Sequence, residues 1–240
     1  MTIDKMDRRQ GPARFIDFSV MPLLLDLDNT LVDRDGAFTN WAPNLFDDEW
    51  GGDAADVDWL VRADAHGYTP RDQLARMLIE RFNLAASTHD NLVDQLLYEH
   101  VDYIDLYPGV RSELVALVDM GVPLIVVTNG DSRQQRLKLE RTGLVDVIRG
   151  TVISGDFEFK KPDARIFEIA KNLAGHGGTS WMVGDHVEAD IAGARQTGCL
   201  TAWVSHGRQW MESWNPTLVA AEPAEVLAAV RRSIETNTAR

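Results

Sequence analysis

Apolar runs of strand length alternate with amphipathic segments of helix length through the second half of this chain. Strands are predicted at 122–127, 152–153, 181–183, 200–204 and 218–219, and helices at 110–120, 132–142, 164–173, 188–197 and 224–234. The run 122–127 is rich in β-branched residues and continuous, as in a strand that is buried on both faces. Strands that alternate with helices of about 10–12 residues are typical of βαβ units. We therefore expect an α/β fold with a parallel-sheet, Rossmann-like core.

A further apolar run at 20–25 predicts one more strand, and two carboxylates follow it directly. Asp26 and Asp28 are separated by one residue, and Asn29-Thr30 come next. In open α/β sheets, ligands gather outside the carboxyl ends of the strands. Two carboxylates there form a hard oxygen site suited to Mg²⁺, and a carboxylate is also able to act as a nucleophile.

Residues 33–107 carry helical periodicity and no strand signal. Apolar residues recur at helix spacing around 57–61, 74–82 and 92–101, and a further helix is predicted around 38–46. Asp53 and Asp72 fit the acidic residues that begin helices. Because this insertion starts just after the strand that ends in Asp26, we expect it to stand over the mouth of the site.

We therefore expect three parts in the chain. These are a flexible tail at 1–19, an α/β hydrolase core at 20–32 and 108–240, and an inserted α-helical cap at 33–107. The length of 240 residues fits one large domain or a core with a smaller module.

Composition narrows the classes of partner. The net charge of −13 disfavours nucleic acid, whose phosphates require basic clusters. No run approaches the roughly 20 apolar residues of a membrane span, and the N-terminus has no signal-peptide core. The single cysteine, Cys199, excludes an internal disulfide and fits a reducing cytoplasm. We expect a cytoplasmic protein that acts on a small molecule, and the sequence does not indicate its oligomeric state.

The predicted strand 122–127 leads into a second motif, Thr128-Asn129-Gly130. A hydroxyl and free backbone N–H groups at the entry to a helix favour a phosphate, so we expect these three residues to bind one. By itself Asn-Gly most often marks only a turn.

The third motif is Lys160-Lys161-Pro162-Asp163. Pro162 starts the next helix and leaves the preceding lysine on a constrained loop. Near two aspartates, such a lysine would neutralise and orient a phosphoryl group.

The fourth motif follows the strand 181–183 and contains Asp185 and Asp190. Gly184 precedes Asp185, and we expect it to let the backbone approach a ligand. Asp190 lies about one helical turn further on and is placed to support the site from behind.

In this order and at these strand ends, the four motifs resemble those of the haloacid dehalogenase-like hydrolase superfamily. The resemblance covers residues 21–234. The insertion looks like the helical cap of the phosphoglycolate-phosphatase-like branch, which implies an α/β core with a cap.

The resemblance also implies roles. Asp26 would be the nucleophile, and Asp28 the general acid and then the general base. Thr128 and Lys161 would hold phosphoryl oxygens; Lys161 is chosen over Lys160 because the family's lysine directly precedes the proline. Asp185 would bind Mg²⁺ together with Asp26 and the backbone carbonyl of Asp28, with Asp190 supporting this shell. His186 stands where the family often has serine, and it is either a tolerated loop residue or a polar group at the rim of the metal shell.

The expected function is that of a Mg²⁺-dependent phosphatase that hydrolyses a small phosphate monoester through an aspartyl-phosphate. A β-phosphoglucomutase-like phosphomutase shares all four motifs and stays open. A receiver-like signalling protein or a non-catalytic binding protein is disfavoured, because receivers lack the long insertion and every catalytic position here is filled. Dehalogenases lack the second aspartate, which is present as Asp28.

The predicted cap is strongly acidic. Residues 33–105 hold sixteen acidic residues, no lysine and five arginines, namely Arg34, Arg62, Arg71, Arg76 and Arg81. Any second anionic group on a substrate should therefore meet one of these arginines.

Overall fold

The computed structural model describes residues 21–46, 51–175 and 178–238 of the chain, so the predicted tail at 1–19 lies outside the described residues. Within them, parallel strands form one sheet in the order β3-β2-β1-β4-β5-β6. The strands are β1 (Leu23–Leu25), β2 (Leu124–Thr128), β3 (Gly150–Ile153), β4 (Trp181–Gly184), β5 (Leu200–Val204) and β6 (Leu218–Ala220). The predicted α/β fold with a parallel Rossmann-like core is confirmed.

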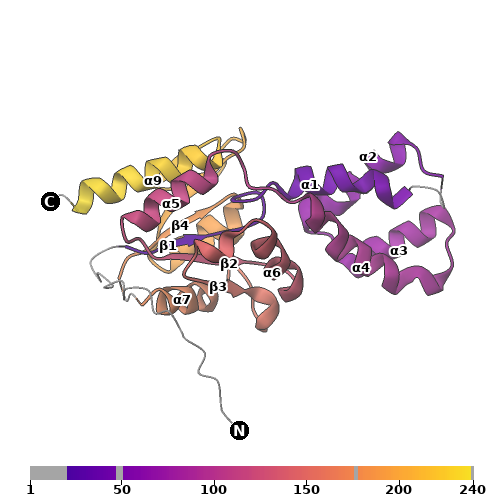
Figure 1. Cartoon of the computed structure of the whole chain (residues 1–240), viewed down its shortest axis with the longest axis horizontal. Coiled ribbons are helices and arrows are strands. Elements are labelled where there is room, and N and C mark those ends of the chain that lie inside the picture. The colour runs from indigo at the N-terminus through magenta and orange to yellow at the C-terminus, as the bar shows by residue number, and fades with distance from the viewer. Residues whose placement is uncertain (1–20, 47–50, 176–177, 239–240) are drawn as a thin grey trace, which may run out of the picture.

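Helices pack on both faces of the sheet because side chains alternate along each strand. Leu23 and Leu25 face the cluster that holds α5 (Val110–Asp119) and α9 (Pro223–Thr238). Leu24 faces the opposite cluster, with α7 (Ala164–Leu173) and α8 (Gly193–Gln196). Figure 1 shows α5 and α9 side by side over the sheet, with α7 beneath it.

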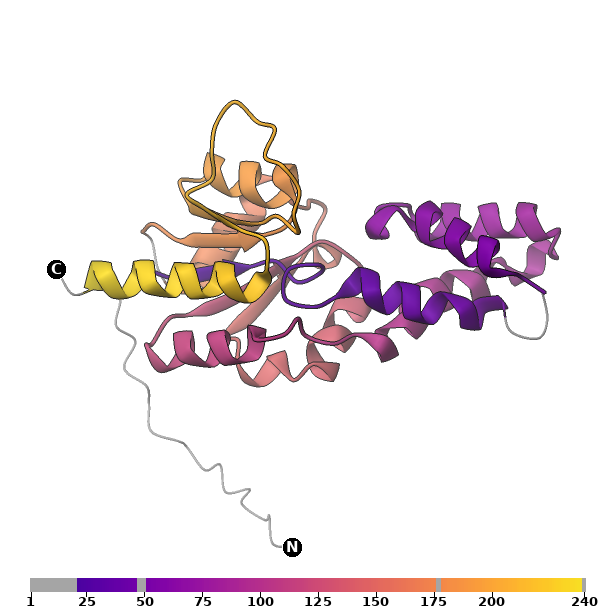
Figure 2. The same ribbon diagram turned by 90° about the horizontal axis from the view of Figure 1, so that it is seen from above.

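The insertion between β1 and β2 is helical and has an apolar core of its own. Its helices are α1 (Arg34–Trp41), α2 (Ala54–Asp64), α3 (Arg71–Phe82) and α4 (His89–Tyr98), with 3₁₀ turns at Ala42–Phe46, Ala65–Gly67, Ala86–Thr88 and Glu99–Tyr103. Phe38, Trp41, Leu60, Leu78 and Leu96 are among its fully buried residues. Both views show these helices standing to one side of the sheet (Figures 1 and 2).

Local sequence signals explain where the helices of the insertion begin. Asp53 caps α2 through a reciprocal pair of hydrogen bonds with Asp56, as a helix-starting acid should. Asp72 lies in the first turn of α3, one residue after the helix begins at Arg71. None of the helices in the described ranges is long and apolar enough to cross a membrane.

Strand register brings the predicted motifs to one edge of the sheet. Leu25 pairs with Val126 on one side and with Val183 on the other. The residues that follow these three strands therefore leave the sheet at the same edge. Asp26, Thr128 and Asp185 lie there although they are far apart in the sequence.

The segment predicted as a regular helix at 188–197 is different. Val187–Ala192 forms a π-helical turn, and α8 follows it. The Nδ1 atom of His186 accepts a hydrogen bond from the Ala189 N–H at 3.0 Å and so caps this turn. Apolar periodicity does not distinguish one π turn from an α-helix, so the prediction was wrong in detail here.

Candidate active site

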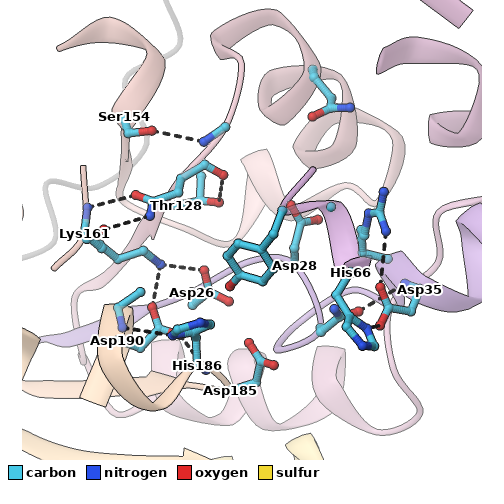
Figure 3. A pocket seen from close by; sticks show the side chains of 18 of the residues that line it. Asp26, Asp28, Asp35, His66, Thr128, Ser154, Lys161, Asp185, His186 and Asp190 are labelled. Atoms are coloured by element: carbon cyan, nitrogen blue, oxygen red, sulfur yellow. Dashed lines mark hydrogen bonds and ion pairs between the residues drawn. The ribbon is translucent and has the colours of Figure 1, made fainter. Parts of the chain in front are cut away.

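A cavity of about 720 Å³ opens between the carboxyl edge of the sheet and the helical insertion. Its lining includes every site residue that the sequence predicts, namely Asp26, Asp28, Thr128, Asn129, Gly130, Lys161, Asp185 and Asp190, together with His186. The insertion contributes the segment 66–71, and Arg208 comes from the loop after β5. The structure thus brings all four motifs to one place (Figure 3).

Three carboxylates gather at the floor of this cavity. Asp26, Asp185 and Asp190 each offer an oxygen, and these oxygens lie within 4.8 Å of one another. Burial, followed by the negative charge of Asp190, raises the pKa of Asp26 to about 7. Burial, followed by the charge of Asp26, raises the pKa of Asp185 to about 8. Negative charge is therefore costly at this spot in the protein alone.

Lys161 is the cation that meets this cluster. Its Nζ atom lies 2.6 Å from Asp26 Oδ1 and 2.7 Å from Asp190 Oδ1, and it donates to the Val127 carbonyl at 2.7 Å. Figure 3 shows the side chain reaching between Asp26 and Asp190. Burial alone would lower the pKa of Lys161, but Asp190 and Asp26 outweigh it and hold this pKa above its usual value. Lys161 therefore stays charged beside Asp26.

Asp26 is oriented by two donors. Its Oδ1 accepts from Lys161, and its Oδ2 accepts from the Thr30 hydroxyl at 2.8 Å. Its backbone N–H donates to Val183, which ties it to β4. The side chain is only 7% exposed, so it has one well-defined position.

Asp28 points to a different partner, which the sequence analysis missed. Lys138 Nζ lies 2.7 and 2.8 Å from the two carboxylate oxygens of Asp28, and Gln135 Nε2 donates to Oδ2 at 3.0 Å. Burial would raise the pKa of Asp28, but Lys138 and Gln135 outweigh it and lower this pKa below its ordinary value. The side chain of Asp28 is not part of the three-carboxylate group.

Lys138 and Gln135 lie on α6 (Ser132–Arg141), the helix that follows the Thr128 motif. Gln134, Gln135, Lys138 and Leu139 form its buried face. A lysine three and four residues after Gln135 and Gln134, on a helix that begins beside a candidate site, was the signal that could have identified Lys138.

The phosphate motif on β2 is built into its surroundings. Gln135 Nε2 donates to the Thr128 hydroxyl at 2.6 Å. The Asn129 side chain bonds both backbone groups of Lys161, at 2.9 Å to its N–H and 3.0 Å to its carbonyl. The Gly130 N–H donates to Ser154 Oγ at 3.0 Å. Asn129 therefore joins the second motif to the third, and its side-chain amide is occupied by hydrogen bonds to the backbone of Lys161.

Asp185 and Asp190 are held by the fourth motif and by the loop after β5. Arg208 lies 3.1 Å from Asp185 Oδ2, and Asp190 Oδ2 accepts from the His186 N–H at 3.0 Å. A Cβ on Gly184 would fall 2.4 Å from Asp190 Oδ2. The glycine thus makes room for Asp190.

The insertion supplies a second charged group at the cavity wall. Asp64 pairs with both Arg34 and Arg71, at 2.8 Å from Arg34 Nη2 and 2.5 Å from Arg71 Nη1. Arg34 and Arg71 line the cavity, whereas Arg62, Arg76 and Arg81 are absent from its described lining. Burial would raise the pKa of Asp64, but Arg34 and Arg71 lower it below the ordinary value.

The carboxylate group fits a divalent cation. Its donors are hard oxygens, they lie close enough to share one ion, and they carry more negative charge than Lys161 compensates. A bound Mg²⁺ would relieve the repulsion that raises the pKa values of Asp26 and Asp185.

Comparison with known proteins agrees with the motifs. Residues 23–204 match the family described as haloacid dehalogenase-like hydrolase. A pyrimidine 5'-nucleotidase of Escherichia coli is 41% identical over 113 residues, which cover 46% of this chain and 50% of that protein. A glyceraldehyde 3-phosphate phosphatase of Methanopyrus kandleri is 35% identical over a stretch that covers 54% of this chain and 58% of that protein. A phosphoserine phosphatase of Thermus thermophilus is 32% identical over a stretch that covers 57% of this chain and 55% of that protein.

The chain spans about half the length of these curated relatives. Solved structures are similar over nearly the whole fold. A magnesium-bound putative hydrolase from Bacillus subtilis has a TM-score of 0.68 at 22% identity, covering 89% of this chain and 99% of that one. A putative β-phosphoglucomutase from Thermotoga maritima has a TM-score of 0.70 at 16% identity, covering 88% and 99%. At such identities the likeness concerns the fold alone.

Proposed function

This chain belongs to the haloacid dehalogenase-like hydrolase family, and we propose that it is a Mg²⁺-dependent phosphatase that hydrolyses a small phosphate monoester. The observation that carries this proposal is the group of Asp26, Asp185 and Asp190, in which Asp26 and Asp190 are buried and Lys161 lies between these two. We further propose that residues 33–107 act as the cap of residues 20–32 and 108–240, and that the protein is cytoplasmic.

Asp26 is the proposed nucleophile. Thr30 and Lys161 fix its carboxylate, so that one oxygen is presented to the cavity. Its attack forms an oxygen–phosphorus bond and breaks the ester bond, which leaves an aspartyl-phosphate and an alcohol. Water then attacks the same phosphorus, releases inorganic phosphate and regenerates Asp26. Splitting hydrolysis in this way lets each displacement use a positioned acid or base.

Asp28 is the proposed acid and base of the two displacements. Because Lys138 and Gln135 lower its pKa in the free protein, Asp28 takes up a proton when the ester binds, gives that proton to the leaving alcohol and later takes one from the attacking water. Lys138 and Gln135 bind its carboxylate from α6 and keep it apart from the three-carboxylate group. This separation supports different roles for two aspartates that are two residues apart.

Mg²⁺, when bound, would offset the repulsion between Asp26 and an anionic ester. We propose that Asp26, Asp185 and the backbone carbonyl of Asp28 are its ligands, with Asp190 as support. Asp190 also contributes to the three-carboxylate group, which supports a place for it at the ion or directly behind it.

The phosphoryl oxygens are proposed to meet Thr128, Lys161 and the backbone N–H group of Asn129, whereas the Gly130 N–H, also expected to bind phosphate, already donates to Ser154 Oγ. Lys161 is buried and charged, so it is able to neutralise an equatorial oxygen. The Asn129 side chain contributes indirectly, because it holds the backbone of Lys161.

Relatives that are named as phosphatases and nucleotidases support phosphate ester hydrolysis over attack on carbon. A family dehalogenase would not need Asp28, which here has two dedicated partners. The same relatives lead us to propose hydrolysis rather than transfer of the phosphoryl group to a second sugar.

The test is a screen of phosphate monoesters, including nucleoside monophosphates, phosphoserine and triose phosphates, scored as released phosphate with excess Mg²⁺ or with EDTA. We expect hydrolysis that EDTA abolishes and added Mg²⁺ restores. The matched control is Asp163→Asn, which removes an exposed carboxylate outside the cavity. Equal release with EDTA, or no release from any ester, would contradict the proposal.

A further inference from the structure

One aromatic side chain of the insertion enters the cavity without a role in the four motifs. Tyr68 lies just after the turn that follows α2, and it lines the same cavity as Asp26, Asp28 and Asp185. Its side chain is 62% exposed, although it belongs to the wall of a cavity. A large aromatic residue in this position projects into open space rather than into a core.

The ring of Tyr68 is held by the core of the molecule. Its centroid lies 5.1 Å from that of His186, at an interplanar angle of 52°. His186 is itself fixed, because its Nδ1 accepts from the Ala189 N–H at the start of the π-helical turn. The contact thus joins the insertion to the residue that directly follows Asp185.

The hydroxyl of Tyr68 has no hydrogen-bond partner among the described residues. Burial, followed by the negative charges of Asp190 and Asp185, raises the pKa of Tyr68 above its usual value, so the hydroxyl keeps its proton. The Tyr68 hydroxyl lines the same cavity as the carboxylates and has no acceptor among the described residues. It is therefore free to donate a hydrogen bond to an anion that binds in the cavity.

We propose that Tyr68 is a substrate-binding residue, whose hydroxyl donates a hydrogen bond to a phosphoryl oxygen while His186 holds its ring in place. This inference rests on the proposed phosphatase function. It makes the insertion a direct contributor to phosphate binding, in addition to the groups at the strand ends. The sequence analysis left His186 unassigned, and the contact with Tyr68 provides a role for it.

The experiment compares Tyr68→Phe with the wild type. Phenylalanine keeps the ring and its packing on His186 and removes only the donor. Inorganic phosphate is titrated calorimetrically into the Mg²⁺-loaded protein, which measures binding without turnover. Loss of a hydrogen bond to a charged group should weaken phosphate binding about 10-fold or more. The KM of the best ester from the screen should rise in parallel.

Tyr103→Phe is the matched control. Tyr103 is another tyrosine of the insertion, its hydroxyl is bonded to Asn44, and it is absent from the cavity lining that the described residues form. Its variant should bind phosphate as the wild type does. If Tyr68→Phe binds phosphate within about twofold of the wild type, where a factor of two is about 0.4 kcal/mol, the inference is wrong.

His186→Asn tests the second half of the proposal. Asparagine retains a side-chain acceptor for the Ala189 N–H and lacks the ring that Tyr68 packs on. We expect weaker phosphate binding in the wild-type background and no further loss in the Tyr68→Phe background. Additive losses would show that His186 does not act through Tyr68. If the wild-type protein hydrolyses no ester and binds no phosphate, the proposed function fails and this inference fails with it.

Discussion

Buried charges are balanced in the helical insertion and unbalanced at the floor of the cavity. In the insertion, Asp64 is 1% exposed and lies between Arg34 and Arg71. The same side chain accepts from the Gly67 N–H at 2.8 Å. Each oxygen of this buried carboxylate has a donor, and its pKa is lowered as expected for a stabilised anion.

At the cavity floor, the opposite holds. Asp26, Asp185 and Asp190 lie together, and burial and mutual repulsion raise the pKa values of Asp26 and Asp185. Lys161 pairs with two of the three, and the partly exposed Arg208 pairs with the third. The insertion therefore pairs its buried charge, whereas the core leaves part of its charge uncompensated, which is typical of functional sites.

The largest effect that tests this comparison is expected from Asp26→Asn. Turnover of the best ester should fall by a factor on the order of 10⁴ or more, since an amide does not replace the nucleophile. The melting temperature should stay equal or rise, because the variant removes a charge that its surroundings disfavour. Lys161 keeps Asp190 as a partner. A marked fall in melting temperature would show that the cluster is built for stability instead.

Asp64→Asn should destabilise the protein, in contrast to Asp26→Asn. Removing this carboxylate takes away the partner that Arg34 and Arg71 share and leaves Arg34 with Asp35 at 3.3 Å, which should lower the free energy of unfolding by about 3 kcal/mol. Denaturation in urea measures this loss. Because the folded-state pKa of Asp64 is lowered, its contribution is present above its unfolded pKa and disappears as the pH falls through the folded value.

Two controls separate the loss of the buried Asp64 ion pairs from the general effect of removing an acidic residue. The acid-induced loss of stability should be smaller in Asp64→Asn than in the wild type, since the variant has no carboxyl to protonate. Asp90→Asn removes an acid of the same insertion that is fully exposed and should leave the unfolding curve unchanged. An unchanged free energy of unfolding for Asp64→Asn would remove the contrast between the two regions.

Lys138→Met tests a buried, paired lysine that lies in the core rather than in the insertion. Lys138 is buried and paired as in the insertion, yet its partner is the proposed acid and base Asp28. We expect kcat/KM for an alkyl ester to fall about 10²-fold, at the low end of what general acid–base catalysis contributes. The fall should be smaller for p-nitrophenyl phosphate, whose leaving group needs no proton.

Lys171→Met is the matched control for a buried lysine. Lys171 is 8% exposed and bonds Glu168 and the Thr197 carbonyl on the far face of the sheet. The Lys171→Met variant should be less stable, and its kcat/KM should change by the same factor for the two esters. Equal losses on both esters in Lys138→Met would indicate a structural role alone.

The alternation of apolar runs with amphipathic segments was enough to predict the parallel sheet, and the places of the motifs along those runs were enough to predict that they meet at one edge. Asp26, Thr128 and Asp185 each follow or end an apolar run, and parallel register then brings them to one edge. Helix ends with strong local signals, such as the capping box at Asp53, were also predictable. These features depend on short stretches of sequence.

Partners from distant elements were not predictable. Lys138 meets Asp28 across 110 residues, and Arg208 meets Asp185 from a loop without a motif. The contact between Gly184 and Asp190 was not foreseen, because the Asp190 side chain comes from the next turn of a π-helix. Such contacts depend on how the elements pack, which periodicity does not encode.

The smallest effects are expected at arginines of the insertion that lie away from the cavity. Arg76 pairs with Asp72 on the exposed face of α3, with the two side chains 66% and 51% exposed. Arg76→Ala should change the free energy of unfolding by no more than about 0.5 kcal/mol. It should also leave KM for anionic esters unchanged, because Arg34 and Arg71 are the insertion arginines on the described cavity lining. A raised KM in Arg76→Ala, measured beside Arg71→Ala, would mean that substrate charge is read by the outer surface of the insertion rather than at the cavity wall.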